Sequence, residues 1–393
     1  MTADPREVRR TVRLAASGVT AQQLQRVVAG LLDEGAEASP RQVVEALEAH
    51  LRRTGRLAGT PATDDALTRL QRAGARVLIA GEAGYPDRLA QLWPQLGAPL
   101  WLFMRGGEPL AGAAVALVGT RQPSLDGLRT AGELAALCAE QGVVVVSGMA
   151  RGIDQAAHAA ALELGGVTVA VLGTGFGVDY PRGATALRAA VERSGGLFTE
   201  VLPGTPPRPA EFLRRNRLIS GLADVCVVVE GRARSGALHT AGLAAAQGRE
   251  VCAVPGSPHQ PTAQAPLALI RDGARCLTRV DDLRQVLAEL PAAAPAGTGS
   301  VGPAADGASV RAPATGVNPA ASAQARTRRL LSGTAAGAHA LLGATPATAG
   351  EVAGALGRPL AEVLAALAEL EERGTIRGTP RGYVRAPPAP ARP

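Results

Sequence analysis

Two stretches of the chain decide the fold: Ala-Val-Ala-Leu-Val-Gly-Thr-Arg at residues 114–121 and Gly-Val-Val-Val-Val-Ser-Gly-Met-Ala-Arg-Gly-Ile-Asp at residues 142–154. Each contains a short apolar run, at 115–118 and at 143–146, that stops at small polar residues, which is typical of a buried parallel strand. Residues 125–141 between them place leucine and alanine at helical spacing. The sequence therefore predicts a β-α-β unit here.

The turns that follow these two predicted strands carry glycine, hydroxyl and arginine residues. In an open parallel sheet the carboxyl ends of the strands form the ligand crevice. Backbone N–H groups, hydroxyl groups and guanidinium groups that converge there form an anion site. The simpler alternative is that the glycines only permit the turns. The candidate residues of the anion site are Gly119, Thr120, Arg121, Ser147, Gly148 and Met149.

The composition is that of a globular protein with an aliphatic core. The chain has 393 residues, of which 46% are hydrophobic and 2% aromatic, so it is long enough for two or three domains. No apolar run reaches transmembrane length and the N-terminus lacks a signal-peptide pattern, so we expect a cytoplasmic protein without a membrane span. The 4 cysteines contain no C-x-x-C pair, and the 5 histidines show no metal-ligand spacing. We therefore expect buried thiols, no metal and no cofactor.

The net charge of +7 is spread along the chain and does not by itself identify a partner. All 41 basic residues are arginine, which suits bidentate contacts to phosphate. Because the excess over acidic residues is thin in each part of the chain, an argument for nucleic acid has to come from arginines clustered in particular motifs.

Residues 1–60 predict a small helical module. The expected helices are 6–16, 21–32 and 40–51. Thr20 and Ser39 are expected to cap the second and the third helix. The pattern suits a module of the SAM or helix-hairpin-helix type, for which we favour structural or protein contacts over contacts with DNA.

Residues 61–290 alternate apolar strands with helices, which predicts a doubly wound, extended Rossmann-like α/β sheet. Residues 61–111 are expected to link the helical module to the sheet, with strands at 77–80 and 99–103. The further expected strands are 167–172, 197–201, 225–229 and 250–254. The further expected helices are 153–164, 184–194, 209–222, 237–247 and 265–273.

The C-terminal part of the chain changes composition. Residues 291–334 are rich in Ala, Pro, Gly, Ser and Thr, which predicts a flexible linker. Residues 335–386 predict three helices and a two-stranded wing, which together form a winged helix, a fold that commonly binds duplex DNA. The third of these helices, 359–373, carries four glutamates that would face phosphate unfavourably, so a protein-contact or vestigial role is favoured.

The predicted helix 209–222 carries three arginines close together. Arg214 and Arg217 share a helical face around Asn216, and no acidic partner is expected nearer than Glu211. We therefore predict a phosphate-binding patch, against the alternative of a solvated charged face.

Two further motifs follow later strands. Gly173-Thr174-Gly175 comes after the strand 167–172, and Arg182 lies on the loop beyond it. Arg234-Ser235-Gly236 comes after the strand 225–229 and begins the next helix. The glycines permit close approach of the backbone to a ligand, so both motifs add candidates to the anion site.

Several classes of enzyme lack their motifs in this sequence. The dinucleotide pattern Gly-x-Gly-x-x-Gly is missing after the first strand, where Pro123 stands at the helix entry, and no Walker A sequence occurs. No Ser-His-Asp set and no carboxylate pair in an acid–base environment is evident. The sequence therefore favours a binding protein without catalysis.

At these motifs the sequence resembles the DprA/Smf family of DNA-processing proteins. The resemblance covers about residues 84–283, and the tail is similar to the family's C-terminal winged helix. It depends on an ordered set of motifs: Gly-Thr-Arg, Ser-Gly-Met-Ala-Arg-Gly-Ile-Asp, Gly-Thr-Gly with Tyr-Pro, Arg-Asn-Arg-x-Ile-x-Gly-Leu, Ser-Gly-x-Leu-x-Thr-Ala and Val-Pro-Gly-Ser.

The resemblance implies a protein of natural transformation that binds incoming single-stranded DNA and protects it. Such a protein helps to displace the single-stranded DNA-binding protein and loads the RecA recombinase. The resemblance also implies a homodimer, with the helix around Leu269-Ile270 in the dimer-forming region. The DNA contacts that it implies by position are Gly119, Thr120, Arg121, Ser147, Gly148, Met149, Gly173, Arg182, Arg214, Asn216 and Arg217.

The chain departs from the family pattern at two places. Residues 259–264 read His-Gln-Pro-Thr-Ala-Gln where the family usually has Ser-x-Gly-x-Asn, which bears on the last loop and the dimer contact. Gly183-Ala184 stands where the family has Glu-Asn.

Two alternative functions remain open. The expected fold resembles that of nucleoside-monophosphate phosphoribohydrolases, but their Pro-Gly-Gly-x-Gly-Thr-x-x-Glu site is absent from this sequence. The other alternative is a winged-helix regulator that binds duplex DNA, for which removal of residues 291–393 would abolish DNA binding.

Overall fold

The computed structural model describes most of the chain before residue 291 and parts of the tail. The described residues are 4–19, 21–33, 38–94, 97–107, 112–290, 335–342, 347, 349–358, 363, 366, 367, 370, 371, 375–379 and 382–385. The predicted linker 291–334, the predicted cap Thr20 and much of the predicted helix 359–373 lie outside them.

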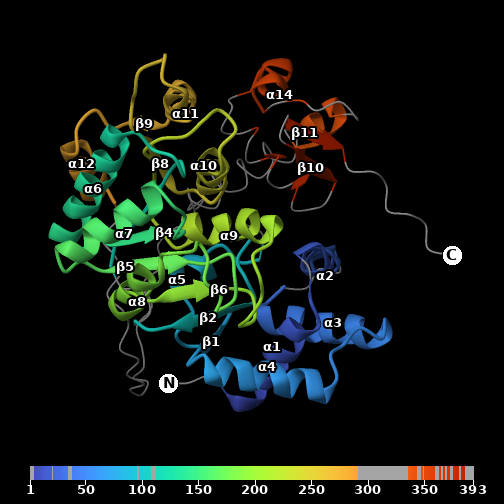
Figure 1. The fold of residues 1–393 in the computed structure, drawn as a ribbon. Coiled ribbons are helices and arrows are strands. Elements are labelled where there is room, and N and C mark those ends of the chain that lie inside the picture. Colours follow the sequence, from blue (N-terminus) through green and yellow to red (C-terminus); the bar gives the residue numbers. More distant parts are fainter. Residues whose placement is uncertain are drawn as a thin grey trace, which may run out of the picture.

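A nine-stranded mixed sheet lies at the centre of the molecule (Figure 1). Its order is β1-β2-β6-β5-β4-β3-β7-β8-β9, and all pairs from β6 to β9 in this order are parallel. This confirms the predicted Rossmann-like α/β sheet. The strands are β1 Arg76–Ile79, β2 Trp101–Arg105, β3 Ala114–Val118, β4 Val144–Ser147, β5 Thr168–Val171, β6 Leu197–Thr199, β7 Val225–Val228, β8 Glu250–Ala253 and β9 Arg275–Cys276.

One edge of the sheet differs from the predicted parallel arrangement. β2 pairs antiparallel with β1 on one side and antiparallel with β6 on the other, where Phe103 lies opposite Thr199. The sequence predicts β1 and β2 as strands but not this pairing. Local periodicity shows which side chains alternate, whereas one partner of β2 is a segment almost a hundred residues away in the sequence.

Helices cover both faces of the sheet. On one face α9, α10 and α11 pack around Leu222, Ala241 and Leu269. On the other face α6, α7 and α12 pack around Leu134 and Ile153. The sequence did not predict α12 or the two-residue strand β9. The helices are α5 Asp87–Ala90, α6 Leu125–Glu140, α7 Ile153–Glu163, α8 Thr185–Ser194, α9 Pro209–Gly221, α10 Gly236–Ala246, the 3₁₀ turn η1 Pro261–Ala263, α11 Gln264–Arg271 and α12 Asp281–Ala288.

Four helices precede the sheet: α1 Pro5–Ala16, α2 Ala21–Asp33, α3 Pro40–Arg53 and α4 Thr60–Arg72. The first three match the predicted helices, and Ser39 caps α3 in a capping box with Gln42. α4 was not predicted, because its sequence is mostly polar and buries few side chains. Val12 and Leu47 belong to the same buried cluster as Phe103 of the sheet, so the helices and this end of the sheet share a core. The module type predicted for residues 1–60 stays a prediction.

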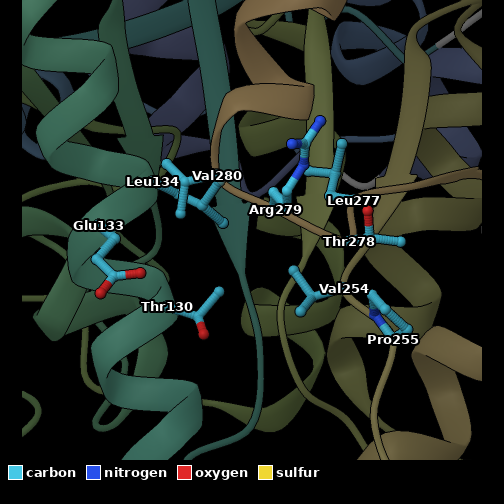
Figure 2. Close-up of a pocket in the computed structure, with 9 residues that line it drawn as sticks. All are labelled: Thr130, Glu133, Leu134, Val254, Pro255, Leu277, Thr278, Arg279 and Val280. Atoms are coloured by element: carbon cyan, nitrogen blue, oxygen red, sulfur yellow. The ribbon is translucent and has the colours of Figure 1, made fainter.

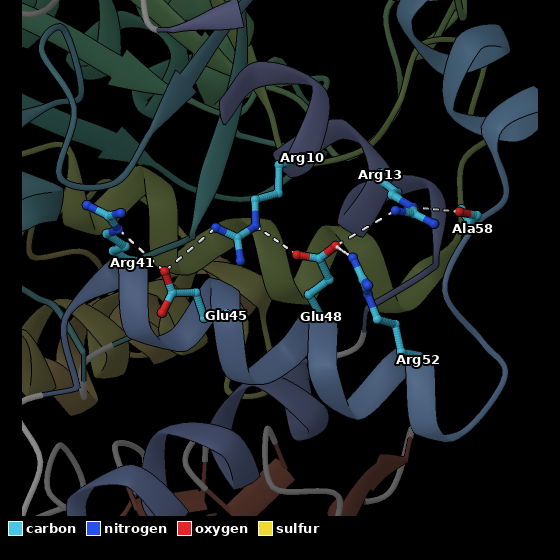
Figure 3. Close-up of polar contacts among 7 residues, drawn as sticks. All are labelled: Arg10, Arg13, Arg41, Glu45, Glu48, Arg52 and Ala58. Carbon is cyan, nitrogen blue, oxygen red and sulfur yellow. Dashed lines mark hydrogen bonds and ion pairs between the residues drawn. The ribbon is translucent and has the colours of Figure 1, made fainter. Parts of the chain in front are cut away.

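Charged contacts hold α1 against α3 (Figure 3). Glu48 accepts a hydrogen bond from Nε of Arg10 at 2.8 Å and from Nη2 of Arg52 at 2.6 Å. Arg13 lies 3.8 Å from the same carboxylate and donates to the carbonyl of Ala58 at 2.8 Å. Burial acts to raise the pKa of Glu48, but the hydrogen bonds and charges of Arg52 and Arg10 outweigh it and lower the pKa below 4.5.

The tail has a hydrophobic cluster of its own, which includes Ala338, Val352 and Leu367. Residues 335–341 are helical, and the other described elements include the helix α14 Ala349–Leu356 and the antiparallel strands β10 Ile376–Thr379 and β11 Gly382–Arg385. The hairpin lies where the wing is predicted, and the winged helix as a whole stays a prediction. Within the described part of the chain, no helix is both long and apolar enough to cross a membrane.

The Glu48 contacts give a testable prediction. We expect Glu48→Gln to lower the free energy of unfolding by about 1–2 kcal/mol at pH 7. Because the folded-state pKa is depressed, the carboxylate stabilises the fold above its unfolded pKa and loses this effect as the pH falls through the folded value. The difference between wild type and variant, measured by urea unfolding, should therefore shrink below pH 4.5.

Glu133→Gln is a matched control, because Glu133 pairs with Arg129 within α6 and its side chain is 46% exposed. It should change the stability by less than about 0.5 kcal/mol. An equal loss in both variants would show that the contacts of Glu48 do not stabilise the module.

Candidate nucleic-acid interface

A cavity of about 310 Å³ lies outside the carboxyl ends of the parallel strands. In the sheet, β3 lies between β4 and β7, so the connections on its two sides run in opposite directions. Ligand crevices form at such switch points of parallel sheets. The lining comes from the turn after β3, from α9, and from the loop that leads from β7 into α10. The sequence predicted a ligand crevice at this edge of the sheet.

The cavity is lined by more positive than negative charge. Four arginines line it, namely Arg121, Arg215, Arg232 and Arg234, against the single carboxylate of Asp154. Arg121, Arg232 and Arg234 are exposed, so a ligand can reach them from solvent. A concave surface with this excess of guanidinium groups attracts anions.

Arg215 forms the buried floor of the cavity. It is 6% exposed, and its Nη1 donates to the carbonyls of Gly148, at 2.6 Å, and of Val171. These carbonyls stand at the ends of β4 and β5, so Arg215 ties α9 to two strands of the sheet. Burial lowers the pKa of Arg215 to about 10, although the nearby charge of Asp154 opposes this shift, so the side chain stays positive at neutral pH.

An unusual backbone angle and hydrogen bonds to a carboxylate define the turn after β4. Met149 has a φ of 61°, which only a small share of residues other than glycine adopt. Asp154 accepts hydrogen bonds from the N–H groups of Gly148 at 3.1 Å and of Ala150 at 3.2 Å. Burial raises the pKa of Asp154, whereas Arg215 and these two N–H groups act to lower it. The two N–H groups are therefore used within the protein.

A hydrogen bond and close packing hold the turn after β3. The N–H of Thr120 donates to the carbonyl of Glu230 at 2.8 Å, and Gly119 has no room for a side chain, because a Cβ would stand 2.5 Å from Ile153. The prediction that backbone N–H groups of the glycine turns bind the anion therefore does not fit Thr120, Gly148 or Ala150.

Helix α10 begins at the cavity. Ser235 caps it by accepting a hydrogen bond from the N–H of Leu238, and Gly236 and Ala237 line the cavity. The side-chain amide of Asn216 lies 3.5 Å from the carbonyl of Gly236 and connects α9 to this helix start. A helix N-terminus carries a partial positive charge, which adds to that of the arginines.

Seven of the eleven predicted site residues are not among the residues that line this cavity, namely Ser147, Gly148, Met149, Gly173, Arg182, Arg214 and Arg217. Gly173 lies against the ring of Phe212, which would be 2.6 Å from a Cβ, and Phe212 in turn packs against Tyr180 with ring centres 4.9 Å apart. Arg182 is exposed two residues beyond Tyr180.

The structure corrects the interpretation of Arg214 and Arg217. Glu200 at the end of β6 lies 2.5 Å from Nη2 of Arg217 and 3.5 Å from Nη2 of Arg214, so an acidic partner nearer in space than Glu211 does exist. Arg217 is 5% exposed, so its guanidinium interacts with groups inside the protein rather than with solvent. The pattern of α9 alone could not show this pair, because Glu200 lies outside the helix, directly after β6.

The side chains of Ser147 and Met149 are fully buried. Ser147 donates its hydroxyl hydrogen to the carbonyl of Leu117 at 2.6 Å and so joins β4 to β3. In this conformation neither side chain can touch a ligand. The sequence had not singled out Arg232, although it follows the end of β7 by four residues in the run Gly-Arg-Ala-Arg-Ser-Gly.

A second cavity, of about 280 Å³, lies on the other face of the sheet (Figure 2). Thr130, Glu133 and Leu134 project into it from α6, opposite the segment 277–280. Its charged lining residues are Glu133 and Arg279, which balance, so it lacks the positive excess of the first cavity. Among the residues that the structure describes, no group of three or more His, Cys, Asp or Glu side chains is placed to hold a metal ion.

The contact between Gly148 and Arg215 gives a second prediction. In Gly148→Ala the new Cβ would stand 2.2 Å from Nη1 of Arg215, which cannot withdraw without losing its carbonyl partners. We expect a loss of about 2–4 kcal/mol in the free energy of unfolding. Gly132→Ala is the control, since its Cβ would meet the nearest atom at 3.7 Å in a helix and should be neutral or stabilising. If both variants lost the same stability in thermal unfolding, Arg215 would not be tightly held against Gly148 as the floor of the cavity.

Comparisons with known proteins agree with this geometry. Residues 76–288 match the family model of DNA recombination-mediator protein A. A DNA processing protein DprA of Bacillus subtilis is 37% identical over 218 residues, which are 55% of this chain and 72% of that protein. A Mycobacterium tuberculosis protein that carries the DprA name is 41% identical over 256 residues, 63% of this chain and 62% of that protein, so the chain matches about three fifths of this relative.

Among solved structures, that of DprA from Streptococcus pneumoniae has a TM-score of 0.60 and 30% sequence identity. The similarity covers 74% of this chain and 99% of the other. The sheet, the motifs at its carboxyl edge and these matches lead to one conclusion: the chain belongs to the DprA/Smf family, the family of DNA recombination-mediator protein A.

Proposed function

We propose that this protein binds single-stranded DNA through the positively charged cavity at the carboxyl edge of its sheet and processes it in natural transformation. The observation that carries the proposal is the exposed set of Arg121, Arg232 and Arg234 around the buried Arg215. Guanidinium groups hold phosphate without reading bases, which suits a protein that accepts any sequence. Membership of the family supports DNA as the ligand.

The size of the cavity supports a single strand over a duplex. A volume of about 310 Å³ lies at the lower end of the range for small-ligand sites, roughly 300–1,000 Å³, and fits one nucleotide unit. A duplex presents two phosphate backbones on a wide cylinder, which cannot enter such a space. Further phosphates along the strand would lie on neighbouring surface, where Arg182 is exposed.

The cellular role that we propose follows the family. The protein would protect incoming strands in the cytoplasm, help to displace the single-stranded DNA-binding protein and load RecA, acting as a homodimer. The other predicted contacts remain part of this proposal: Gly119, Thr120, Ser147, Gly148, Met149, Gly173, Arg182, Arg214, Asn216 and Arg217. That Gly119, Thr120 and Asn216 line the cavity supports this part of the proposal.

We propose further that the protein has no catalytic activity. Burial lowers the pKa of His158 to about 3 and that of His239 to about 4, so neither imidazole is poised to transfer protons at neutral pH. Asp154, the carboxylate of the cavity, is bound to two backbone N–H groups. Release of free base from nucleoside monophosphates would contradict this proposal and favour a phosphoribohydrolase.

Arg121→Ala tests the phosphate contacts. We expect the variant to bind a single-stranded oligonucleotide about tenfold more weakly at moderate salt. The slope of log affinity against log salt should become less steep by about 0.7, the value for one phosphate contact to a single strand. Fluorescence anisotropy over a salt series measures both quantities.

Arg129→Ala is the matched control, because it removes the same charge from α6 at a side chain that is 80% exposed and outside the cavity lining. It should leave the affinity within about twofold of wild type. If both variants bind equally, or if the affinity of wild type does not change with salt, the phosphate proposal is wrong.

Removal of residues 291–393 separates this proposal from a winged-helix regulator of duplex DNA. The tail has its own hydrophobic cluster, so we expect the remaining residues to fold and to keep single-strand binding largely intact. Loss of all DNA binding by the shortened, folded protein would favour the regulator.

A further inference from the structure

Helix α6 holds a carboxylate of the protein at its N-terminus. Glu230 reaches there from the end of β7 and is 8% exposed. Its Oε2 accepts from the N–H of Ser124 at 2.9 Å, and its Oε1 accepts from the Ser124 hydroxyl at 2.5 Å. The side-chain amide of Gln260 donates to the same Oε1 at 3.0 Å.

This position has a general significance in parallel α/β sheets. α6 follows β3, the strand at the switch point, and the N-terminus of the helix in this place commonly receives the phosphate of a nucleotide. The attraction comes from unpaired backbone N–H groups and the positive end of the helix dipole. In this protein the Ser124 hydroxyl accepts from the N–H of Gly127 at 3.0 Å, and the Glu230 carboxylate accepts from the N–H and the hydroxyl of Ser124. Side chains of the protein therefore occupy this end of the helix.

The helix is shaped to admit the carboxylate. At Gly127 a Cβ would stand 2.5 Å from Cδ, 2.7 Å from Oε2 and 2.9 Å from Oε1 of Glu230. Gly127 lies inside α6 with no positive φ, so its backbone conformation does not require glycine. Glycine is less favourable than alanine inside a helix. The space that the carboxylate needs therefore explains why residue 127 is glycine.

We propose that Glu230 is a built-in anion that fills the phosphate position of α6, so that the protein excludes inorganic phosphate and mononucleotides from this position. Glu230 is thereby a specificity-determining residue of the crevice. It leaves the arginine-lined cavity as the place for an anion. The turn after β4 repeats the arrangement, since Asp154 occupies the N–H groups of Gly148 and Ala150.

This inference goes beyond the proposed function and does not require that the protein bind DNA. Its tests use inorganic phosphate and thermal unfolding. A failure of the DNA experiments would leave these tests unaffected, and a failure of these tests would not bear on DNA binding.

The first test is a pair of substitutions at Gly127 and Glu230. In wild type, Gly127→Ala should lower the unfolding midpoint by roughly 3–10 °C, because the Cβ meets the carboxylate. In the background of Glu230→Ala the same substitution should leave the midpoint unchanged or raise it, since alanine favours the helix. A loss of the same size in both backgrounds would overturn the proposal.

The second test adds the anion back. Inorganic phosphate should raise the midpoint of Glu230→Ala by roughly 2–4 °C over sodium chloride of equal ionic strength, because a ligand that binds the folded state stabilises it. In wild type phosphate has only the arginine-lined cavity to bind, so the rise should be smaller than in Glu230→Ala by this amount. Glu230→Gln is the control, since it keeps the volume of the side chain and so keeps phosphate out.

Two outcomes would overturn the proposal. One is a phosphate effect that is equal in Glu230→Ala, Glu230→Gln and wild type. The other is inorganic phosphate or AMP bound at the N-terminus of α6 in a crystal structure of wild type. The second measurement needs no variant, so it decides the question even if Glu230→Ala does not fold.

Discussion

The guanidinium of Arg215 fixes one helix to the ends of two parallel strands, and the crevice depends on this contact. It binds the carbonyls of Gly148 and Val171 at the edge of the sheet, where strands end and backbone groups need partners. Each hydrogen bond from a charged donor contributes about 1.5–3 kcal/mol, and a buried charge without such partners costs several. α9 is therefore held in one position, which sets one wall of the cavity and the conformation of the turn at Met149.

The crevice has a consistent distribution of charge. The carboxylate of Asp154 accepts hydrogen bonds from backbone N–H groups in the turn after β4, and that of Glu230 accepts one at the start of α6. Guanidinium groups at Arg121, Arg232 and Arg234 are exposed on the same edge. Main-chain amides bind a phosphate only at short range and in fixed geometry, whereas flexible guanidiniums can follow a polymer whose position varies. This division suits a ligand held by its charge along a strand, rather than a small nucleotide held at one point.

The helices before the sheet contribute stability to this arrangement. Val12 and Leu47 share a hydrophobic cluster with Phe103 and Leu172, and Leu172 directly follows β5. With few aromatic residues, the core fills its volume with valine, leucine and alanine, which pack well between helices and parallel strands. The tail is different, because among the residues that the structure describes its cluster is made of tail residues alone.

The sequence by itself determined the β-α-β unit at 114–154, the alternation of strands and helices, and the edge at which the motifs gather. These features are local, since hydrophobic period and glycine position act within a few residues. The same motifs supported the family resemblance. The tertiary structure alone decided which arginines face solvent. Arg217 turns inward to Glu200, and Arg215 passes beneath a turn 67 residues away, because their partners come from other strands. A buried ion pair or a buried cation depends on residues that only the folded chain places side by side. The spacing of residues along one helix cannot predict it.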